Sequence, residues 1–232
     1  MISLDYILNA VKVAKLVSID SIIIEPSMVR AIKSDDNSVV ILQSKDVPDM
    51  PFGSIGMTRL DVFSARYDVL RTQDNFSVEV DVDAEANCAR SIVLKAKGTK
   101  VDYRCAKPQA IKAPRQLNDI FTHRVKMNAE SAHLMQKAIS AMQSPTHVTF
   151  FSNNEGVTFE FSDINNDKFE HTFIEKAERL TKDASGKFAH RYLMKTLFPL
   201  LKQSPDGHFD VGQKGTLAFH VNGLTVYVLA QV

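Results

Sequence analysis

Residue types that often carry chemistry are present in this chain of 232 residues, but their spacing matches no catalytic or metal-binding motif. Seven histidines, at positions 123, 133, 147, 171, 190, 208 and 220, include no HExxH pair or comparable metal-ligand spacing. The chain has no GxSxG, GxxxxGK[ST] or GxGxxG motif. We therefore expect no enzyme activity, no metal and no cofactor. An enzyme stays an alternative, because a Ser/His/Asp triad can be scattered beyond what spacing reveals.

Three carboxylates recur at alternate positions of one segment, which is a second place to look for a metal. Glu79, Asp81 and Asp83 alternate with the apolar residues of 76–82, so they fall on one face of a predicted strand. Hard divalent cations need oxygen ligands that converge from loops, and no such loops are indicated here. We interpret the row as the solvated face of a sheet.

Composition and charge place the chain among globular proteins. It is 44% hydrophobic, and its net charge is +1. Cys88 and Cys105 lack CxxC spacing, so we expect two reduced thiols. Charged residues interrupt the first 17 positions, and no apolar run is long enough for a membrane span. We expect a cytoplasmic protein with no membrane partner.

Basic residues concentrate in the predicted helices. In the segment 187–202, Leu193, Leu197 and Leu200 form an apolar stripe opposite Lys195 and Lys202. The four helix candidates, residues 1–19, 58–71, 124–143 and 187–202, carry +1, +1, +2 and +4, which leaves −7 on the rest. One basic stripe is usually just a solvated face. Four that recur on a repeated scaffold could hold phosphates without reading bases.

Hydrophobic periodicity places these helices among short strands. Helices are predicted over Leu4–Val17, from an N-cap at Thr58, over Ala129–Met142 and over 187–202, where Pro199 should end or kink the helix near Phe198. Strands are predicted at 21–25, 28–32, 38–43, 76–82, 89–96, 99–105, 147–151, 156–161, 168–174 and over 208–229, where Asn222-Gly223 indicates a tight hairpin turn.

The chain contains an internal repeat. A shift of 133 places Leu60 on Leu193, Phe76 on Phe209 and Val78 on Val211; a shift of 125 then places Gly98 on Gly223. Within each half, a helix followed by three strands occurs twice. This predicts two similar domains, 1–106 and 125–232, joined by a proline-containing connector over 107–124.

With this organisation, the chain resembles the DNA polymerase sliding clamps, in particular the two-domain, trimer-forming clamps of phages, archaea and eukaryotes. The most specific match is the end of the chain, a hairpin followed by Val228-Leu229-Ala230-Gln231, which is similar to the Leu-Ala-Pro-like tail of clamps but has Gln231 where proline is common. The resemblance implies an α+β DNA-clamp fold, with two helices packed on antiparallel sheets in each domain. It implies a homotrimeric ring, not an enzyme, that encircles duplex DNA, tethers the replicative DNA polymerase and is opened by an ATP-dependent clamp loader.

The resemblance also assigns expected roles to residues of this chain. The DNA-facing residues would be Lys12, Lys15, Arg59, Arg66, Arg71, His133, Lys137, Arg191, Lys195 and Lys202. Subunits would meet through Lys97, Lys100, Tyr103 and Arg104 of one chain and Glu170 and Phe173 of the next. Partner proteins would dock on Leu117, Ile120, Phe121, Tyr227, Leu229 and Ala230, although the connector residues could instead simply pin the connector to the sheet.

Three other interpretations remain open. The first is a monomeric or dimeric processivity factor of the same fold. The second is an α+β hydrolase or ligand-binding protein, and the third is a saddle-shaped transcription factor of repeated β-α units. The mass in solution separates the trimeric ring from the others.

Overall fold

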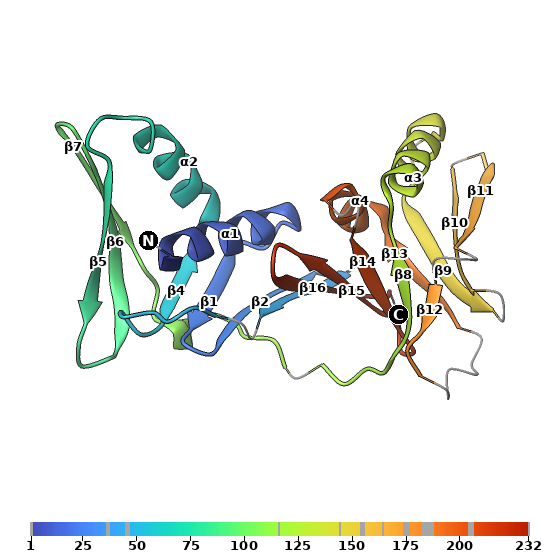
Figure 1. Cartoon of the computed structure of the whole chain (residues 1–232), viewed down its shortest axis with the longest axis horizontal. Coiled ribbons are helices and arrows are strands. Elements are labelled where there is room, and N and C mark those ends of the chain that lie inside the picture. The colour runs from blue at the N-terminus through green and yellow to red at the C-terminus, as the bar shows by residue number, and fades with distance from the viewer. Residues whose placement is uncertain are drawn as a thin grey trace. The chain divides into compact units, whose positions relative to one another are not determined.

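The computed structural model describes residues 2–35, 38–44, 47–115, 117–143, 145–153, 156–163, 165–173, 177–181, 188–203 and 207–231 (Figure 1). The chain divides into two compact units. The first contains Met1–Lys33 and Leu42–Arg115, and the second contains Ser34–Ile41 and Gln116–Val232. No helix in the described ranges is long and apolar enough to cross a membrane.

The elements of the N-terminal half begin with a helix. In order they are α1 (Ile2–Leu16), β1 (Ser21–Glu25), β2 (Met28–Asp35), β3 (Ser38–Ser44), β4 (Ile55–Thr58), α2 (Leu60–Leu70), β5 (Ser77–Asp83), β6 (Cys88–Ala96), β7 (Thr99–Arg104) and the short 3₁₀ helix η1 (Pro108–Ala110). One sheet of the first unit has the order β2-β1-β4, and a separate three-stranded sheet has the order β5-β6-β7. All pairings are antiparallel.

The helices of the first unit bury their apolar stripes and expose their charged ones. Ile7, Val11 and Ala14 recur every three or four residues of α1 and are buried, whereas Lys12 and Lys15 are exposed. Helix α1 contacts β1 and α2, and α2 contacts β6 (Figure 1). The helices therefore cover the two sheets on one side and leave their basic residues to solvent.

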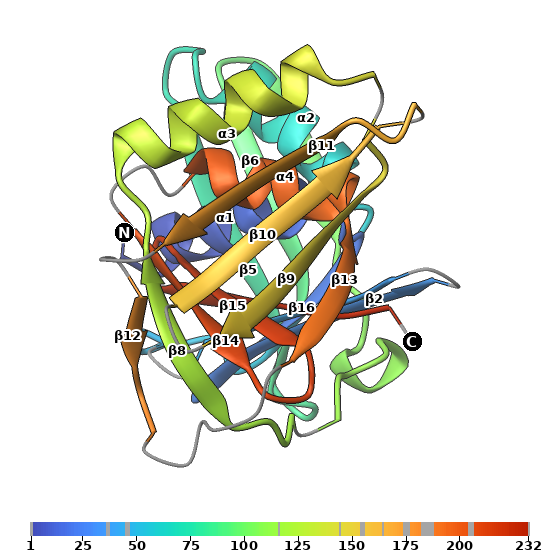
Figure 2. The ribbon, with the colours of Figure 1, turned by 90° about the vertical axis from the view of Figure 1, so that its right-hand side faces the viewer.

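The second unit repeats this plan with a larger second sheet. Its elements are β8 (Phe121–Lys126), α3 (Ala129–Ala141), β9 (His147–Asn153), β10 (Gly156–Ser162), β11 (Lys168–Phe173), β12 (Ala177–Arg179), β13 (Ala189–Leu193), α4 (Met194–Gln203), β14 (His208–Gly212), β15 (Thr216–Val221) and β16 (Leu224–Leu229). The sheets have the orders β12-β8-β14-β15-β16 and β11-β10-β9-β13. Helices α3 and α4 contact each other (Figure 2).

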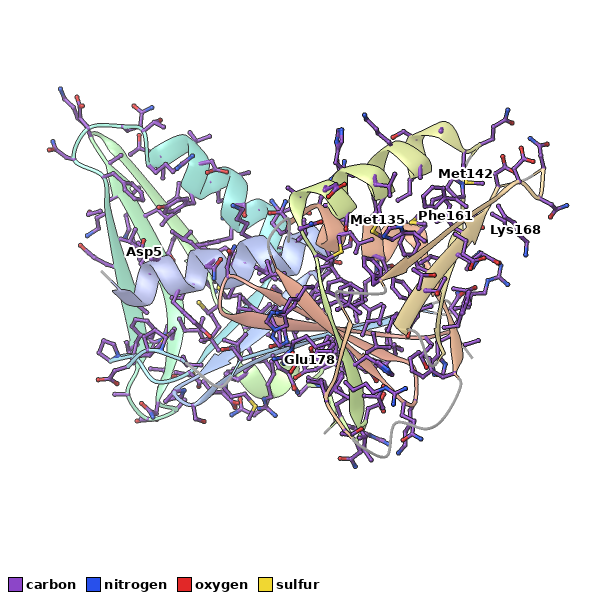
Figure 3. All side chains as sticks on the ribbon, turned by 45° about the vertical axis from the view of Figure 1, so that its right-hand side comes forward. Asp5, Met135, Met142, Phe161, Lys168 and Glu178 are labelled. Atoms are coloured by element: carbon purple, nitrogen blue, oxygen red, sulfur yellow. The ribbon has the colours of Figure 1, made fainter. Side chains whose placement is uncertain are left out.

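Aromatic side chains fill the core of the second unit. Phe150 packs edge-on against Phe209 at 5.7 Å between ring centroids, and Phe209 stacks on Phe219 at 5.2 Å. Met135 of α3 and Phe161 of β10 are both buried and point into this unit (Figure 3). The predicted turn is confirmed, because Asn222 and Gly223 both have positive φ and join β15 to β16.

The predicted helix over 187–202 is wrong in its first half. Residues Ala189–Leu193 form β13, which pairs with β9, and α4 begins only at Met194. Tyr192 is fully buried opposite Val148, so cross-strand packing outweighs the helical spacing of these residues. Pro199 lies inside α4, which continues to Gln203. Of the two outcomes predicted for Pro199, an end or a kink near Phe198, the end is therefore wrong.

Other local predictions also needed correction. Thr58 closes β4 rather than capping α2, and the N-cap is Arg59. Strand β8 begins inside the predicted connector, and β4 and β12 fall in segments for which no strand was predicted. The remaining three helices and the α+β class with helices on antiparallel sheets are confirmed.

Candidate functional site

The basic residues of the first unit that were predicted to face DNA are exposed, but not all of them are free of ion pairs. Lys15 pairs with Asp61 at 3.1 Å, which links α1 to α2, and Arg71 pairs with Asp68 at 3.0 Å. Among the described residues, the ion pairs include no carboxylate partner for Lys12, Arg59 or Arg66. Three cations at α1 and α2 are therefore available to an external anion.

Arg59 is held in an unusual backbone conformation. Its φ and ψ are 55° and 51°, in the left-handed region that non-glycine residues rarely adopt. The Tyr103 hydroxyl accepts a hydrogen bond from Thr58 N at 3.0 Å and donates one to Thr58 O. Burial raises the pKa of Tyr103 to about 12, so this hydroxyl keeps its proton. Tyr103 thereby anchors the residue before Arg59, and the exposed guanidinium extends from a fixed point.

The residues of the second unit that were predicted to face DNA lie on three elements, α3, α4 and β13. His133 and Lys137 are exposed on α3, and Lys195 and Lys202 are exposed on α4. The ammonium of Lys202 lies 4.3 Å from the ring centroid of Phe198, which orients it across the end of the helix.

Arg191 does not share the face of α4, because it lies on β13. Its Nη2 is 3.0 Å from Nδ1 of His147, and its carbonyl accepts a hydrogen bond from Gln231 N at 2.8 Å. Burial, and then the charge of Arg191, lower the pKa of His147, so the imidazole is neutral and can accept from the guanidinium. Arg191 thus ties β13 to β9 and to the C-terminal tail.

The charge excess of the helices is smaller than the sequence indicated. Within their bounds, the four helices hold six basic and four acidic side chains, a net charge of +2 instead of the predicted +8. Arg124 and Lys126 lie on β8, and Lys187 lies outside the described residues. Contact with a polyanion would therefore involve few charges, so it would be weak, and its dependence on salt would be modest.

The two strands predicted to join subunits are both sheet edges. Strand β7 ends the order β5-β6-β7, and β11 ends the order β11-β10-β9-β13. Edge strands present unpaired N–H and C=O groups that a neighbouring chain can use. Lys97, Lys100 and Arg104 are exposed at or beside β7, and Glu170 is exposed on β11.

Two residues of this predicted interface point inward. Tyr103 is fully buried, with its ring 5.0 Å from that of Phe63, and Phe173 is also buried, against Phe159. Their side chains support the edges from within the core. Only their backbones could take part in strand pairing.

The residues predicted to bind partner proteins all belong to the second unit, and none of them is fully buried. Phe121 and Tyr227 pack at 6.2 Å between ring centroids, and the Ile120 side chain is 57% exposed. Leu117, Leu229 and Ala230 are partly exposed. We call these six residues the connector-tail patch.

Asp119 fixes the connector beside this patch. Its carboxylate accepts hydrogen bonds from Ile120 N at 2.8 Å, Lys214 N at 2.9 Å and Thr216 N at 3.1 Å. The Asp119 side chain therefore attaches the connector to the backbone of Lys214 and Thr216, and the apolar side chain of Ile120 is not needed for this attachment. Asp119 was not singled out from the sequence, because two of its three partners, Lys214 and Thr216, are 95 and 97 residues away.

A polar cluster on β8, β14 and β15 was also missed. His208, Asp210 and His220 offer ligand atoms within 4.8 Å of one another, a set that transition metals can use. Both oxygens of Asp210 already accept hydrogen bonds from Arg124, at 2.7 and 2.9 Å. Binding a metal would thus require this pair to open. Only the register of three strands brings these residues together, so spacing in the sequence could not reveal them.

The fold matches those of solved clamp proteins over nearly its full length. A. fulgidus PCNA, solved with the C-terminal region of FEN-1 bound, has a TM-score of 0.64 and 20% identity, covering 97% of this chain and 93% of that one. PCNA of Entamoeba histolytica has a TM-score of 0.64 and 13% identity, covering 97% and 95%. PCNA of Thermococcus kodakaraensis has a TM-score of 0.63 and 12% identity, covering 99% and 96%. No protein-family model and no curated protein sequence matches the chain.

Proposed function

We propose that this chain, which has the fold of the PCNA clamps, is a sliding clamp for a replicative DNA polymerase. The observation that carries the proposal is the match across 97% of this chain and 93% of a PCNA chain, which includes both units. In the proposed assembly, three chains close into a ring around duplex DNA. The protein catalyses no reaction; it acts in the cytoplasm, of a phage host if phage-encoded, where an ATP-dependent loader opens and closes the ring.

Exposed cations on all four helices support contact with the DNA backbone. Lys12, Arg66, Lys137 and Lys195 each lie on a different helix, so every helix contributes a phosphate contact in the proposal. Phosphate contacts carry no base specificity, which suits a ring that must move along any sequence. The low net charge of the helices suits the same task, because a tightly held ring would not slide.

Open edges at β7 and β11 support self-assembly. Antiparallel addition of β11 from one chain to β7 of the next would extend a sheet across the contact, with Lys100 and Arg104 near Glu170. Exposed ion pairs contribute only about 0–1 kcal/mol each, so backbone pairing and buried apolar area must supply most of the stability. Such head-to-tail contacts are heterologous, and three of them form a ring only if the rotation between neighbouring chains brings the third chain back to the first.

The mass in solution tests this proposal directly. Gel filtration with light scattering should give a particle three times the 25.9 kDa of the chain, at micromolar concentration and moderate salt. A stable monomer under these conditions would contradict the ring and favour a monomeric processivity factor. If the protein is not retained on closed circular DNA, even with a loader, the proposed sliding-clamp function is wrong.

A further inference from the structure

Strand β5 has an open edge bordered by an apolar groove. It ends the sheet β5-β6-β7, and among the described residues no strand lies on its outer side. Val78, Val80 and Val82 point into a groove of about 670 Å³ between this strand, the start of α1 and the loop before β4. Leu4, Ile7, Phe52 and Phe76 complete an almost wholly apolar wall.

The second unit shows what occupies the equivalent position there. The internal repeat places Phe76 on Phe209 and Val78 on Val211, so β5 corresponds to β14. Strand β14 has β15 on one side and β8 on the other, antiparallel, with Val125 opposite Phe209. Val125 and His123 of β8 are buried. In the second unit, a strand thus fills the space that is open in the first.

The outward face of the same pair shows what charge such a strand carries. Arg124 of β8 lies opposite Asp210 of β14, and their side chains form two hydrogen bonds. On β5 the outward residues are Glu79 and Asp81, with Asp83 beyond a bulge. Lys95 neutralises Glu79 at 2.6 Å, but Arg90 is 3.8 Å from both Asp81 and Asp83, too far for a strong bond to either.

We propose that the β5 groove binds an extended segment of a partner protein, which adds to β5 as an antiparallel strand. Apolar side chains at alternate positions enter the groove, and basic side chains between them meet Asp81 and Asp83. The backbone groups of the edge supply affinity, and the valine-lined groove selects the apolar positions. A second copy of β5 is a poor occupant, because antiparallel pairing would set carboxylates against carboxylates.

This site is distinct from the proposed clamp function and does not depend on it. All the groove residues belong to the first unit, whereas the connector-tail patch belongs to the second. The chain would therefore have two protein-binding surfaces of different chemistry: an acidic strand edge and a connector patch.

A labelled peptide that copies residues 121–128, FTHRVKMN, tests the proposal because it carries the pattern that β14 accepts. Fluorescence anisotropy with the full chain should show saturable binding, and Val80→Asp should weaken it at least about tenfold. Val69→Asp is the matched control, since Val69 is 65% exposed on α2 and lies outside the groove. Circular dichroism would verify that both variants fold.

Peptide backbone methylation gives a second test with an unaltered protein. In the chain itself, Met127 N bonds to Gly207 O at 2.8 Å. Amides that bond to the neighbouring strand alternate along an antiparallel pair, so the amide of Val125 also faces β14, whereas the amide of Arg124 faces away from β14. N-methylation at the Val125 position should abolish binding, and N-methylation at the Arg124 position should not. No saturable binding up to about 1 mM peptide overturns the proposal, as does equal sensitivity to both methylations. If the chain self-associated without peptide, and the Val80→Asp variant did not, the occupant of the groove would instead be a second copy of the chain.

Discussion

At the scale of residues, Asp210 is the most strongly perturbed carboxyl group described. Burial alone would raise its pKa, but hydrogen bonds from Arg124 and His220, and their charges, lower the pKa to about 2. The side chain is only 9% exposed, so the pair with Arg124 is poorly screened. Arg124 and Asp210 join β8 to β14 at the strand next to the connector.

Replacing Asp210 with Asn should remove an acid-sensitive part of the stability. A depressed pKa stabilises the fold above the unfolded value of about 3.9, and this contribution disappears as the pH falls toward 2. We expect Asp210→Asn to lower the free energy of unfolding by about 2 kcal/mol near pH 7, and by much less near pH 2. Urea denaturation across this range measures the difference. Asp20→Asn, at an exposed position, is the control. If Asp210→Asn lowered the free energy of unfolding by the same amount at pH 7 and at pH 2, the lowered pKa of Asp210 would be contradicted.

Ile120 is the residue that best tests the connector-tail patch. Its side chain is 57% exposed, while Gln213 N bonds to its carbonyl at 2.9 Å, so a change of side chain leaves the connector attached. Ile120→Asp should therefore keep the fold and the oligomer but reduce polymerase binding by about tenfold or more, as expected for an anchor position. Surface plasmon resonance with the polymerase measures this. Normal binding by Ile120→Asp would show that these residues only pin the connector.

At the scale of elements, the edge of β7 is the feature on which assembly depends. Cys105 N bonds to Arg90 O at 3.0 Å, and hydrogen-bonded pairs alternate along an antiparallel ladder. Tyr103 N therefore faces β6, whereas Asp102 N faces the open edge. A proline at Tyr103 would break the sheet and remove a buried ring, but a proline at Asp102 affects only the edge.

Asp102→Pro should thus convert the proposed trimer to monomers without unfolding the chain. Asp102→Ala removes the same carboxylate and keeps the N–H, so it should stay trimeric. Light scattering reports the mass, and circular dichroism reports the fold. If Asp102→Pro remained a trimer, the subunits would have to meet through another edge.

At the scale of the whole molecule, the proposed function rests on a weak electrostatic hold on DNA. Lys195→Glu with Lys202→Glu should leave the fold intact, since both side chains are exposed on α4. Once loaded on nicked circular DNA, this variant should dissociate faster than the unaltered protein. A plot of the logarithm of its DNA-binding constant against the logarithm of the salt concentration should have a slope smaller in magnitude by about 2, one for each lost phosphate contact. Filter binding over a salt series measures it.

The exposed Lys112, which lies outside the helices, provides the control for this pair. Lys112→Glu changes the net charge in the same direction at a position with no proposed DNA contact. An equal loss of retention in this variant would mean that total charge, and not the face of α4, governs the interaction.

Much of the fold followed from local patterns in the sequence. The 3.6-residue spacing of Ile7, Val11 and Ala14 is sufficient for α1, because these side chains cover one face wherever the helix packs. Asn222 and Gly223 determine a hairpin by their own backbone preferences. The repeat and the C-terminal tail together indicated a clamp, and the fold is confirmed by structures only 12–20% identical.

Only the tertiary structure decided where strand pairing outweighs local preference. Residues 189–193 have an acceptable helical pattern, but β9 offers them backbone partners and a place for Tyr192 in the core. The same holds for β8, whose residues lack clear alternation and become a strand because β14 and β12 flank them. Asp119, the Arg124–Asp210 pair and the open edge of β5 all depend on contacts between residues far apart in the chain. Such contacts are set by register and packing, which no local spacing encodes.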